Sequence, residues 1–408
     1  MPSHPALIFV TPAYGELAPG GLAVSARRIV GHLAEAYPVT VITPSDLIPP
    51  LSHRVSNECG LKVVEVGKVA EPGMFLQFLA DVIETVSRTE PNPLFLSFYC
   101  NAMAYATTLA ARRQGVSPLL FARGNDIDLD VFGESAFQIH YALSHARKVF
   151  CVSREIQSKV QAFCPTAQTQ YIPNGVDVDH FAFQDGYAPS SCTTAIKLNR
   201  KTLSPGPSPC KGEGLTVHQI LNLKAVSLRP VIGLFGDIKQ KKGLDTLLAA
   251  MDFGRYRLRI VGELREESQK LLHGFVSLNP QALAQIELVP YIQERDGLLK
   301  HYREVDIVCI PSRHEGMSNV MLEAMAVGKL CVCSAVGGAL DVIRDGENGY
   351  LFDPHSPESL RLALERAALC LSEGHESVRR EASRTIREGF SAALERERYL
   401  EALRAICR

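Results

Sequence analysis

Short apolar runs alternate with longer amphipathic stretches along most of the chain. The first run, Ala6–Thr11, ends in the glycine-rich loop PAYGELAPGG, and Leu22–Ala36 then has the spacing of an amphipathic helix. Strands that alternate with helices in this way are typical of a parallel, doubly wound sheet. Further strands are expected at Pro38–Thr43, Leu61–Val66, Pro93–Tyr99, Pro118–Ala122 and Lys148–Val152.

The alternation stops between residues 184 and 228. This stretch is rich in Ser, Pro, Gly and Thr, and Pro205, Pro207 and Pro209 have no backbone N–H to donate. Such a composition favours a linker or a poorly ordered insertion.

A second set of strands and helices follows the break. The chain is therefore predicted to be an α/β protein with two Rossmann-like, doubly wound parallel-sheet domains, at residues 1–183 and 229–385, that face each other across a cleft. Residues 386–408 are expected to form a helix that packs back toward the first domain. Strands are expected at Pro230–Phe235, Tyr256–Val261, Ile286–Val289, Asp306–Ile310 and Lys329–Ser334, and helices from Leu244, at Ser318–Val327, at Ser356–Leu371 and from Glu376 to the end.

Composition narrows the class of protein. A chain of 408 residues fits two or three domains, and a formal net charge of -1 gives no reason to expect a nucleic-acid partner. The eleven cysteines include no Cys-x-x-Cys pair, and several lie in apolar runs. Buried, reduced thiols are therefore expected instead of a zinc site or disulfides. These cysteines are Cys151, Cys309, Cys331 and Cys333.

The chain's first residues and its apolar runs bear on location. The sequence MPSHPALIFVTPAYG lacks the charged start and long apolar core of a secretory signal. No apolar run approaches the roughly 18–20 residues of a membrane-spanning helix. We expect a cytoplasmic protein, and a peripheral contact at the inner face of the membrane stays open.

The segment from Arg313 to Phe352 contains the most informative chemistry. The loop SRHEGM follows a strand and precedes a helix, for which Ser318 and Asn319 both suit the N-cap. Gly316 allows close approach to the backbone, and the free N–H groups of a helix start attract anions. A diphosphate is the expected guest.

Two carboxylates, Glu315 and Glu323, flank this helix start. If both were helical, they would be about 12 Å apart along the axis. That is a poor match to the paired carboxylates of a glycosidase, which lie roughly 5–9.5 Å apart. Two separate tasks fit better, because each carboxylate can accept two hydrogen bonds from a vicinal diol. One would hold a sugar ring and the other the ribose of the same ligand.

The string PSRHEGMSNVMLEAMAVG, with the later Gly337–Gly338 pair and IRDGENGYLF, resembles the glycosyltransferase family 4 enzymes, which have the GT-B fold. The resemblance implies that Glu315 contacts the donor sugar and that Glu323 holds the ribose hydroxyls. It also implies that the backbone from Gly316 through Met317, Ser318 and Asn319 to Val320 meets the phosphates of a nucleoside-diphosphate-sugar donor.

A second match is GDIKQKKG, residues 236–243. The family usually has an Arg after the first glycine and a Lys before the second, and both neutralise the donor diphosphate. Lys242 matches the second position, but Asp237 departs from the first. Lys239 or Lys241 could supply the missing charge, and the alternative is a solvated basic turn before a helix.

The first half offers weaker candidates. Gly20 and Gly21 open a helix and could contact the donor, or they could form a plain tight turn. The loop RGND resembles a family variant that would turn Arg123 and Asp126 toward the cleft, and the alternative is a capping turn. Many family members have a His in this region, and this loop has none. Asn174–Gly175 is interpreted as a structural turn that closes the first domain.

The resemblance implies a retaining sugar transfer that needs no metal or other cofactor. The acceptor would be a glycan, a lipid-linked molecule or a small molecule. One alternative is a GT-B binding or regulatory subunit that has lost transfer, for which Asp237 and the missing His are the reasons. A dinucleotide-dependent oxidoreductase is disfavoured, because neither glycine-rich loop has the Gly-x-Gly-x-x-Gly spacing.

Overall fold

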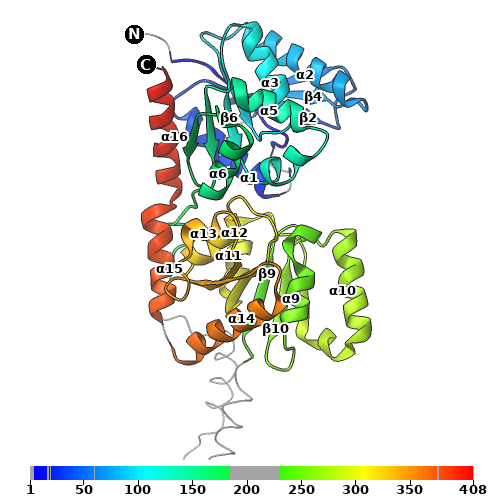
Figure 1. Cartoon of the computed structure of the whole chain (residues 1–408), viewed down its shortest axis with the longest axis vertical. Helices are drawn as coiled ribbons and strands as arrows, with labels where there is room; N and C mark the ends of the chain where they lie inside the picture. Colours follow the sequence, from blue (N-terminus) through cyan, green and yellow to red (C-terminus); the bar gives the residue numbers. More distant parts are fainter. Residues whose placement is uncertain are drawn as a thin grey trace, which may run out of the picture.

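The computed structural model describes residues 4–15, 18, 20–58, 60–183, 229–374 and 376–407. Two α/β domains lie one above the other, the first in blue to green and the second in green to orange (Figure 1). This confirms the predicted architecture of two doubly wound domains. The stretch 184–228, predicted to be a linker, lies outside the described residues.

The N-terminal sheet has eight strands in the order β3-β4-β2-β1-β5-β6-β7-β8. All neighbours are parallel except β3 and β4. The strands are β1 Leu7–Val10, β2 Val39–Ser45, β3 His53–Glu58, β4 Leu61–Gly67, β5 Leu94–Phe98, β6 Leu119–Ala122, β7 Lys148–Cys151 and β8 Thr169–Tyr171. The helices are α1 Gly21–Ala34, α2 Pro72–Ser87, α3 Ala102–Arg113, α4 Asn125–Asp128, η1 Asp130–Phe132, α5 Ala136–His145 and α6 Arg154–Phe163.

The C-terminal sheet has six parallel strands in the order β11-β10-β9-β12-β13-β14. The strands are β9 Val231–Phe235, β10 Arg257–Val261, β11 Ile286–Val289, β12 Ile307–Ile310, β13 Leu330–Ser334 and β14 Tyr350–Phe352. The helices are η2 Gln240–Lys242, α9 Leu244–Ala250, α10 Glu266–Leu278, η3 Pro280–Gln285, α11 Arg295–Arg303, α12 Asn319–Ala326, α13 Ala339–Val342, α14 Pro357–Ser372, α15 Glu376–Gly389 and α16 Ala392–Cys407.

The expected strands agree with the structure to within two residues, because most of them are buried apolar runs. Three short edge or outer strands, β3, β8 and β14, were not expected. Strand β3 has no buried residue, and β8 has none either, so neither has the apolar signature of a core strand. Of the cysteines in the described part of the chain, seven are buried, Cys407 is exposed, and all are free thiols.

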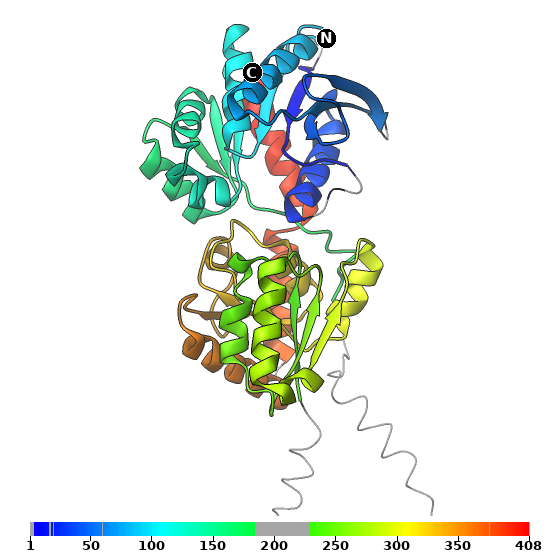
Figure 2. The same cartoon turned by 90° about the vertical axis from the view of Figure 1, so that its right-hand side faces the viewer.

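The stretch from Glu376 onward is helical, as expected, but it forms two helices. Helix α15 ends at Gly389, and α16 begins at Ala392 after a break at Phe390–Ser391. The break pairs Val176 with Ser391, where the chain passes between the two domains. Figure 2 shows α16, in red, running up across the first domain. There Tyr399, Leu400 and Leu403 join the core that contains β1 and β2.

Candidate active site between the domains

A cavity of about 600 Å³ lies between the two domains. We call it the interdomain cavity. Helix α1 and the segment around Asp177 line it from the first domain, and the ends of β9 and β10, the loop after β11 and the start of α12 line it from the second. This is the edge where parallel strands end, as expected for doubly wound sheets. Of the predicted site residues, five line it: Gly20, Gly21, Asn319, Val320 and Glu323.

Glu323 projects from α12 into this cavity, and its carboxylate is held by Tyr302. The phenol donates a hydrogen bond of 2.7 Å to Glu323 Oε2. Tyr302 is fully buried and stacks on Phe235, with ring centroids 4.4 Å apart. Burial raises the pKa of Glu323 to about 7, and the hydrogen bond from Tyr302 offsets only part of this rise. Sequence reasoning missed Tyr302, because nothing in its own segment points to Glu323.

Glu315 lies in the loop before α12 and forms an ion pair. Lys242 Nζ is 2.5 Å from Glu315 Oε2, and the hydroxyl of Ser312 donates to the same oxygen at 3.2 Å. Burial alone would raise the pKa of Glu315, but Lys242 and then Lys241 outweigh it, so the pKa is lowered. Lys242 lines a small hollow that shares Phe235 and Val320 with the interdomain cavity.

The helix start between the two carboxylates touches the opposite domain. Ser318 is the N-cap of α12, and its hydroxyl accepts from Met321 N at 3.3 Å. A Cβ at Gly316 would clash with the carbonyl of Arg123, so only glycine fits this close approach. Asn319 Nδ2 reaches Ser25 Oγ on α1 at 3.2 Å. The predicted phosphate-binding segment therefore lies against the first domain.

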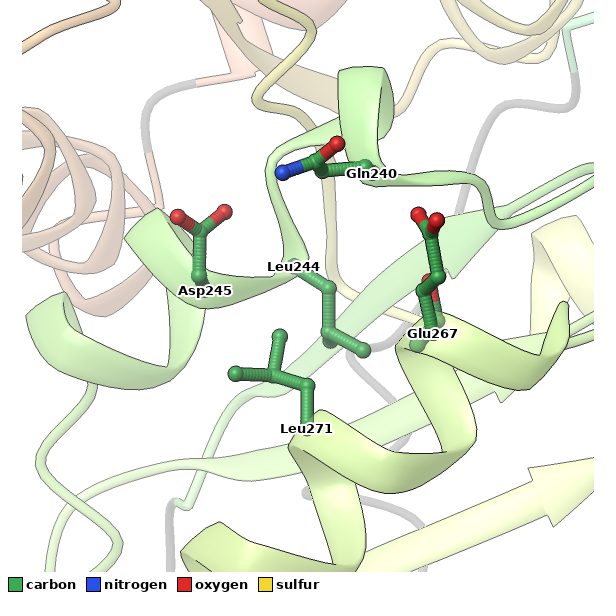
Figure 3. Close-up of a pocket in the computed structure, with 6 residues that line it drawn as sticks. Gln240, Leu244, Asp245, Glu267 and Leu271 are labelled. Carbon is green, nitrogen blue, oxygen red and sulfur yellow. The ribbon is translucent and has the colours of Figure 1, made fainter.

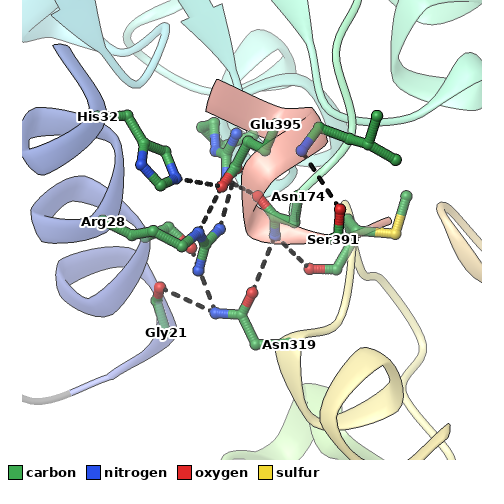
Figure 4. A network of polar contacts seen from close by, with 11 residues as sticks. Gly21, Arg28, His32, Asn174, Asn319, Ser391 and Glu395 are labelled. Atoms are coloured by element: carbon green, nitrogen blue, oxygen red, sulfur yellow. Dashed lines mark hydrogen bonds and ion pairs between the residues drawn. The ribbon is translucent and has the colours of Figure 1, made fainter. Parts of the chain in front are cut away.

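Asn174 joins this contact and is not in a turn. Its Nδ2 donates to the carbonyl of Met317 at 3.0 Å and to Asn319 Oδ1 at 3.1 Å. Figure 4 shows Asn174 and Asn319 side by side. A Cβ at Gly175 would clash with the backbone of Ser391. The interpretation of Asn174–Gly175 as a turn is therefore wrong. Tertiary contacts across the domain boundary fix this dipeptide instead.

The basic residues of GDIKQKKG have partners already. Lys239 Nζ is 2.9 Å from Asp237 Oδ2, and Lys241 Nζ donates to Asn125 Oδ1 at 3.0 Å. Asp237 also binds Arg265, at 2.7 Å and 3.2 Å. Burial raises the pKa of Asp237, but these two cations lower it overall. Neither Lys239 nor Lys241 lines the interdomain cavity, so their expected role with the diphosphate stays a prediction.

Asp126 does not face the cleft, contrary to the prediction. It is fully buried, and its carboxylate accepts hydrogen bonds from the backbone N–H groups of Cys100, Arg123 and Gly124 at 2.7–3.1 Å. Burial raises its pKa to about 6 despite these bonds. Asp126 thus holds its own loop against the segment of Cys100, and it does not cap the helix that follows, because neither α4 nor α5 has a side-chain cap. The side chain of Arg123 packs over Phe98 and donates to Asn174, and it does not line the interdomain cavity either.

A buried ion pair lies beside the cavity, across α1 and α16. Arg28 binds Glu395 through two hydrogen bonds of 2.5 Å and 3.1 Å, and His32 Nε2 lies 3.5 Å from the same carboxylate (Figure 4). Burial would raise the pKa of Glu395, but Arg28 dominates and holds it at about 2. Arg28 and His32 also line the interdomain cavity. A sequence signal for a cation at this site was available, because Arg28 lies on the helix that follows the Gly20–Gly21 pair.

A second hollow, of about 280 Å³, lies on the C-terminal domain. Figure 3 shows the side chains around it. Gln240, Leu244, Asp245, Glu267 and Leu271 line it, and none of them lines the interdomain cavity. Among the described residues no group of three or more His, Cys, Asp or Glu side chains could hold a metal ion. No described helix is both long and apolar enough to cross a membrane.

Family models match both halves of the chain. The model described as Glycosyltransferase Family 4 matches residues 19–180, and the model described as Glycosyl transferases group 1 matches residues 229–368. Together they cover more than half of the sequence. A curated relative, D-inositol 3-phosphate glycosyltransferase from Xylanimonas cellulosilytica, is 29% identical over 198 residues, which are 46% of this chain and 39% of the relative. The chain spans less than half of the length of the curated relatives that it matches first.

Solved structures share the fold. Sucrose-phosphate synthase from Thermosynechococcus elongatus superposes with a TM-score of 0.75 at 16% identity and covers 99% of both chains. The Anabaena protein HepE, in complex with UDP-glucose, superposes with a TM-score of 0.71 at 15% identity over 98% of this chain and 100% of that one. At such identities the likeness shows the arrangement of the two domains and no more.

Proposed function

This chain belongs to the glycosyltransferase family 4 enzymes with the GT-B fold, and from that membership we propose that it transfers a sugar from a nucleoside-diphosphate-sugar donor to an acceptor hydroxyl. One observation carries the proposal. The unit from β12 to α12 presents Glu315 before a helix start and Glu323 behind it, beside an interdomain cavity of about 600 Å³. A nucleotide sugar has hydroxyls at both ends and a diphosphate between them, which matches this order of groups.

The proposed roles follow from the contacts. Glu323 accepts the ribose hydroxyls, because Tyr302 occupies only one of its two oxygens. The backbone of Gly316–Val320 meets the phosphates at the start of α12. Glu315 contacts the donor sugar, and Lys242, its neighbour at 2.5 Å, supplies positive charge to the departing diphosphate.

The reaction would proceed with retention of the anomeric configuration. The bond from the anomeric carbon to the diphosphate oxygen breaks, and the acceptor oxygen bonds to the same face of that carbon. The acceptor proton passes to an oxygen of the leaving phosphate. Because negative charge grows on the diphosphate in the transition state, a fixed cation lowers the barrier more than it tightens ground-state binding.

A screen of donors and acceptors tests the proposal and identifies the donor's base and the acceptor. The HepE structure contains UDP-glucose, so uridine donors are the first to test, followed by GDP- and ADP-sugars. Purified protein is mixed with each donor and a panel of glycan, lipid-linked and small-molecule acceptors, and the release of nucleoside diphosphate is measured. We expect release with one base and retained configuration in the product, as read by NMR. Inversion, or no binding of any nucleoside diphosphate, would overturn the proposal.

A binding or regulatory subunit without transfer activity is the second candidate. It is favoured by Asp237, whose carboxylate takes the place of a cation and is already engaged by Arg265 and Lys239. The same assay separates the two candidates. A binding subunit would bind a nucleoside diphosphate in calorimetry and release none from any donor.

A further inference from the structure

Four arginines line the interdomain cavity, and three of them have carboxylate partners. Arg28 binds Glu395, Arg265 binds Asp237, and Arg295 binds Asp177 at 3.2 Å. The fourth, Arg27, donates from Nη1 to the backbone carbonyl of Gly15 at 2.5 Å. In the described part of the chain, no carboxylate lies within ion-pair distance of Arg27. Its positive charge is therefore not neutralised by these neighbours.

The position of Arg27 on α1 directs it into the cavity. It follows Gly20 by seven residues and Val24 by three, which is the spacing of one helix face, and all three line the cavity. Gly236 and Asp237 line the same cavity from the opposite domain. Arg27 thus offers a cation from the first domain to the space where the second domain offers a carboxylate.

The wall around Asp237 is close to neutral. Asp237 and Glu263 contribute two negative charges, and Arg265 and Lys239 contribute two positive ones. A phosphate ligand would gain little from this cluster, since each cation there already has a carboxylate. Arg27 differs from these cations because its partner is a backbone carbonyl oxygen, which has no full negative charge and occupies only one of its five N–H donors. Its remaining donors can bind two phosphate oxygens side by side.

We propose that Arg27 binds a phosphate group of the ligand in the interdomain cavity and supplies, from the N-terminal domain, the cation that Asp237 does not. The inference rests on the proposed function for the identity of that ligand. Two sources share the chemistry: the diphosphate of the nucleotide donor and a phosphate carried by the acceptor.

The test uses the full chain with Arg27→Gln, which removes the charge, and Arg27→Lys, which keeps it but loses the planar pair of donors. Arg112→Gln is the matched control, because Arg112 is exposed on α3 and does not line the cavity. Affinities for UDP, GDP and ADP, for the matching nucleosides and for inorganic pyrophosphate are measured by calorimetry at low salt. Arg27→Gln should lower the affinity for the diphosphate that the native chain binds by about 10- to 100-fold. The affinity for the matching nucleoside should stay unchanged.

The other arms separate the outcomes. Arg27→Lys should retain part of the affinity, and Arg112→Gln should retain all of it. If diphosphate and pyrophosphate affinities stay native in Arg27→Gln but the acceptor's KM rises, the phosphate belongs to the acceptor. If none of these changes, or if the nucleoside loses affinity equally, the proposal for Arg27 is overturned. If the native chain binds pyrophosphate but no nucleotide, the proposed function fails. The proposal for Arg27 is then still tested by comparing the pyrophosphate affinity of Arg27→Gln with that of the native chain.

Discussion

The two ends of the β12–α12 unit contain the same kind of side chain in opposite surroundings. Glu315 faces the ammonium of Lys242, which holds its pKa below the ordinary range once the effect of burial is outweighed. Glu323 faces the neutral phenol of Tyr302, and burial leaves its pKa at about 7. At neutral pH Glu315 is therefore fully charged and Glu323 only partly so. The partner, and not the residue type, decides how each carboxylate behaves.

The largest effect should come from breaking the ion pair. Lys242→Met removes the ion-pair partner of the largely buried Glu315 carboxylate, so we expect a loss of about 3 kcal/mol in the free energy of unfolding and a turnover at least about 100-fold lower. Charge reversal is a poorer test than the Met variant, because two carboxylates would then lie together. Urea denaturation and donor turnover are the measurements.

A double variant separates the two effects at this end of the site. Lys242→Met with Glu315→Gln should regain most of the stability, since no charge is left unpaired, while its turnover stays low. Turnover close to native in the single variant would show that Lys242 has no part in the reaction.

The Glu323 end should make stability depend on pH. Its pKa is about 7 in the folded chain and ordinary, near 4.5, in the unfolded one. Between these values the folded state binds more protons, so the free energy of unfolding falls as pH rises through about 7. We expect a contribution on the order of 2 kcal/mol between pH 5 and pH 8. Glu323→Gln should lack this contribution when denatured in parallel, and an identical pH dependence would contradict the assignment.

The same substitution should alter ligand preference. A carboxylate can accept hydrogen bonds from both ribose hydroxyls, whereas an amide has only one acceptor oxygen. Glu323→Gln should therefore lower the affinity for a ribonucleoside diphosphate by about 10-fold at pH 8. The native chain should prefer it over the 2′-deoxy analogue, and the variant should lose that preference. Calorimetry with both ligands tests this, and an undiminished preference would place the ribose elsewhere.

The smallest effect should come from the phenol itself. Tyr302→Phe removes the hydrogen bond that partly lowers the pKa of Glu323, so the pH at which binding strengthens should rise by less than about one unit. Affinity at pH 7 should fall about two- to fivefold. Tyr256→Phe is the control, because that buried hydroxyl has no hydrogen-bond partner among the residues that the structure describes and lies outside the cavity lining. A shift of equal size in both variants would point to a general packing effect.

Local signals in the sequence were enough for much of the fold. Buried apolar runs mark β1, β9 and β12, and α12 is capped by Ser318, one of the two candidates that the motif offered. These features depend on neighbours within a few residues.

The partners of the site residues could not be predicted in the same way. Tyr302 and Glu323 are 21 residues apart, and Arg28 and Glu395 are 367 residues apart. Asp126 could have capped its loop or faced the cleft, and the choice depends partly on the N–H of Cys100 from another segment. Such contacts exist only after the sheets and both domains have assembled, so spacing along the chain does not reveal them.

The position of α16 has a consequence for synthesis. Its residues Tyr399, Leu400 and Leu403 complete a core whose other members, apart from further residues of α16 itself, all come from the first domain, starting with β1, α1 and β2. A ribosome adds roughly 5–20 residues per second. Helix α16 is therefore synthesised on the order of 10 seconds or more after the rest of the first domain is complete. During that interval an apolar surface of the nascent chain remains uncovered, which makes it a natural binding site for chaperones. A chain cut at the break near Ser391 would retain that exposed surface permanently.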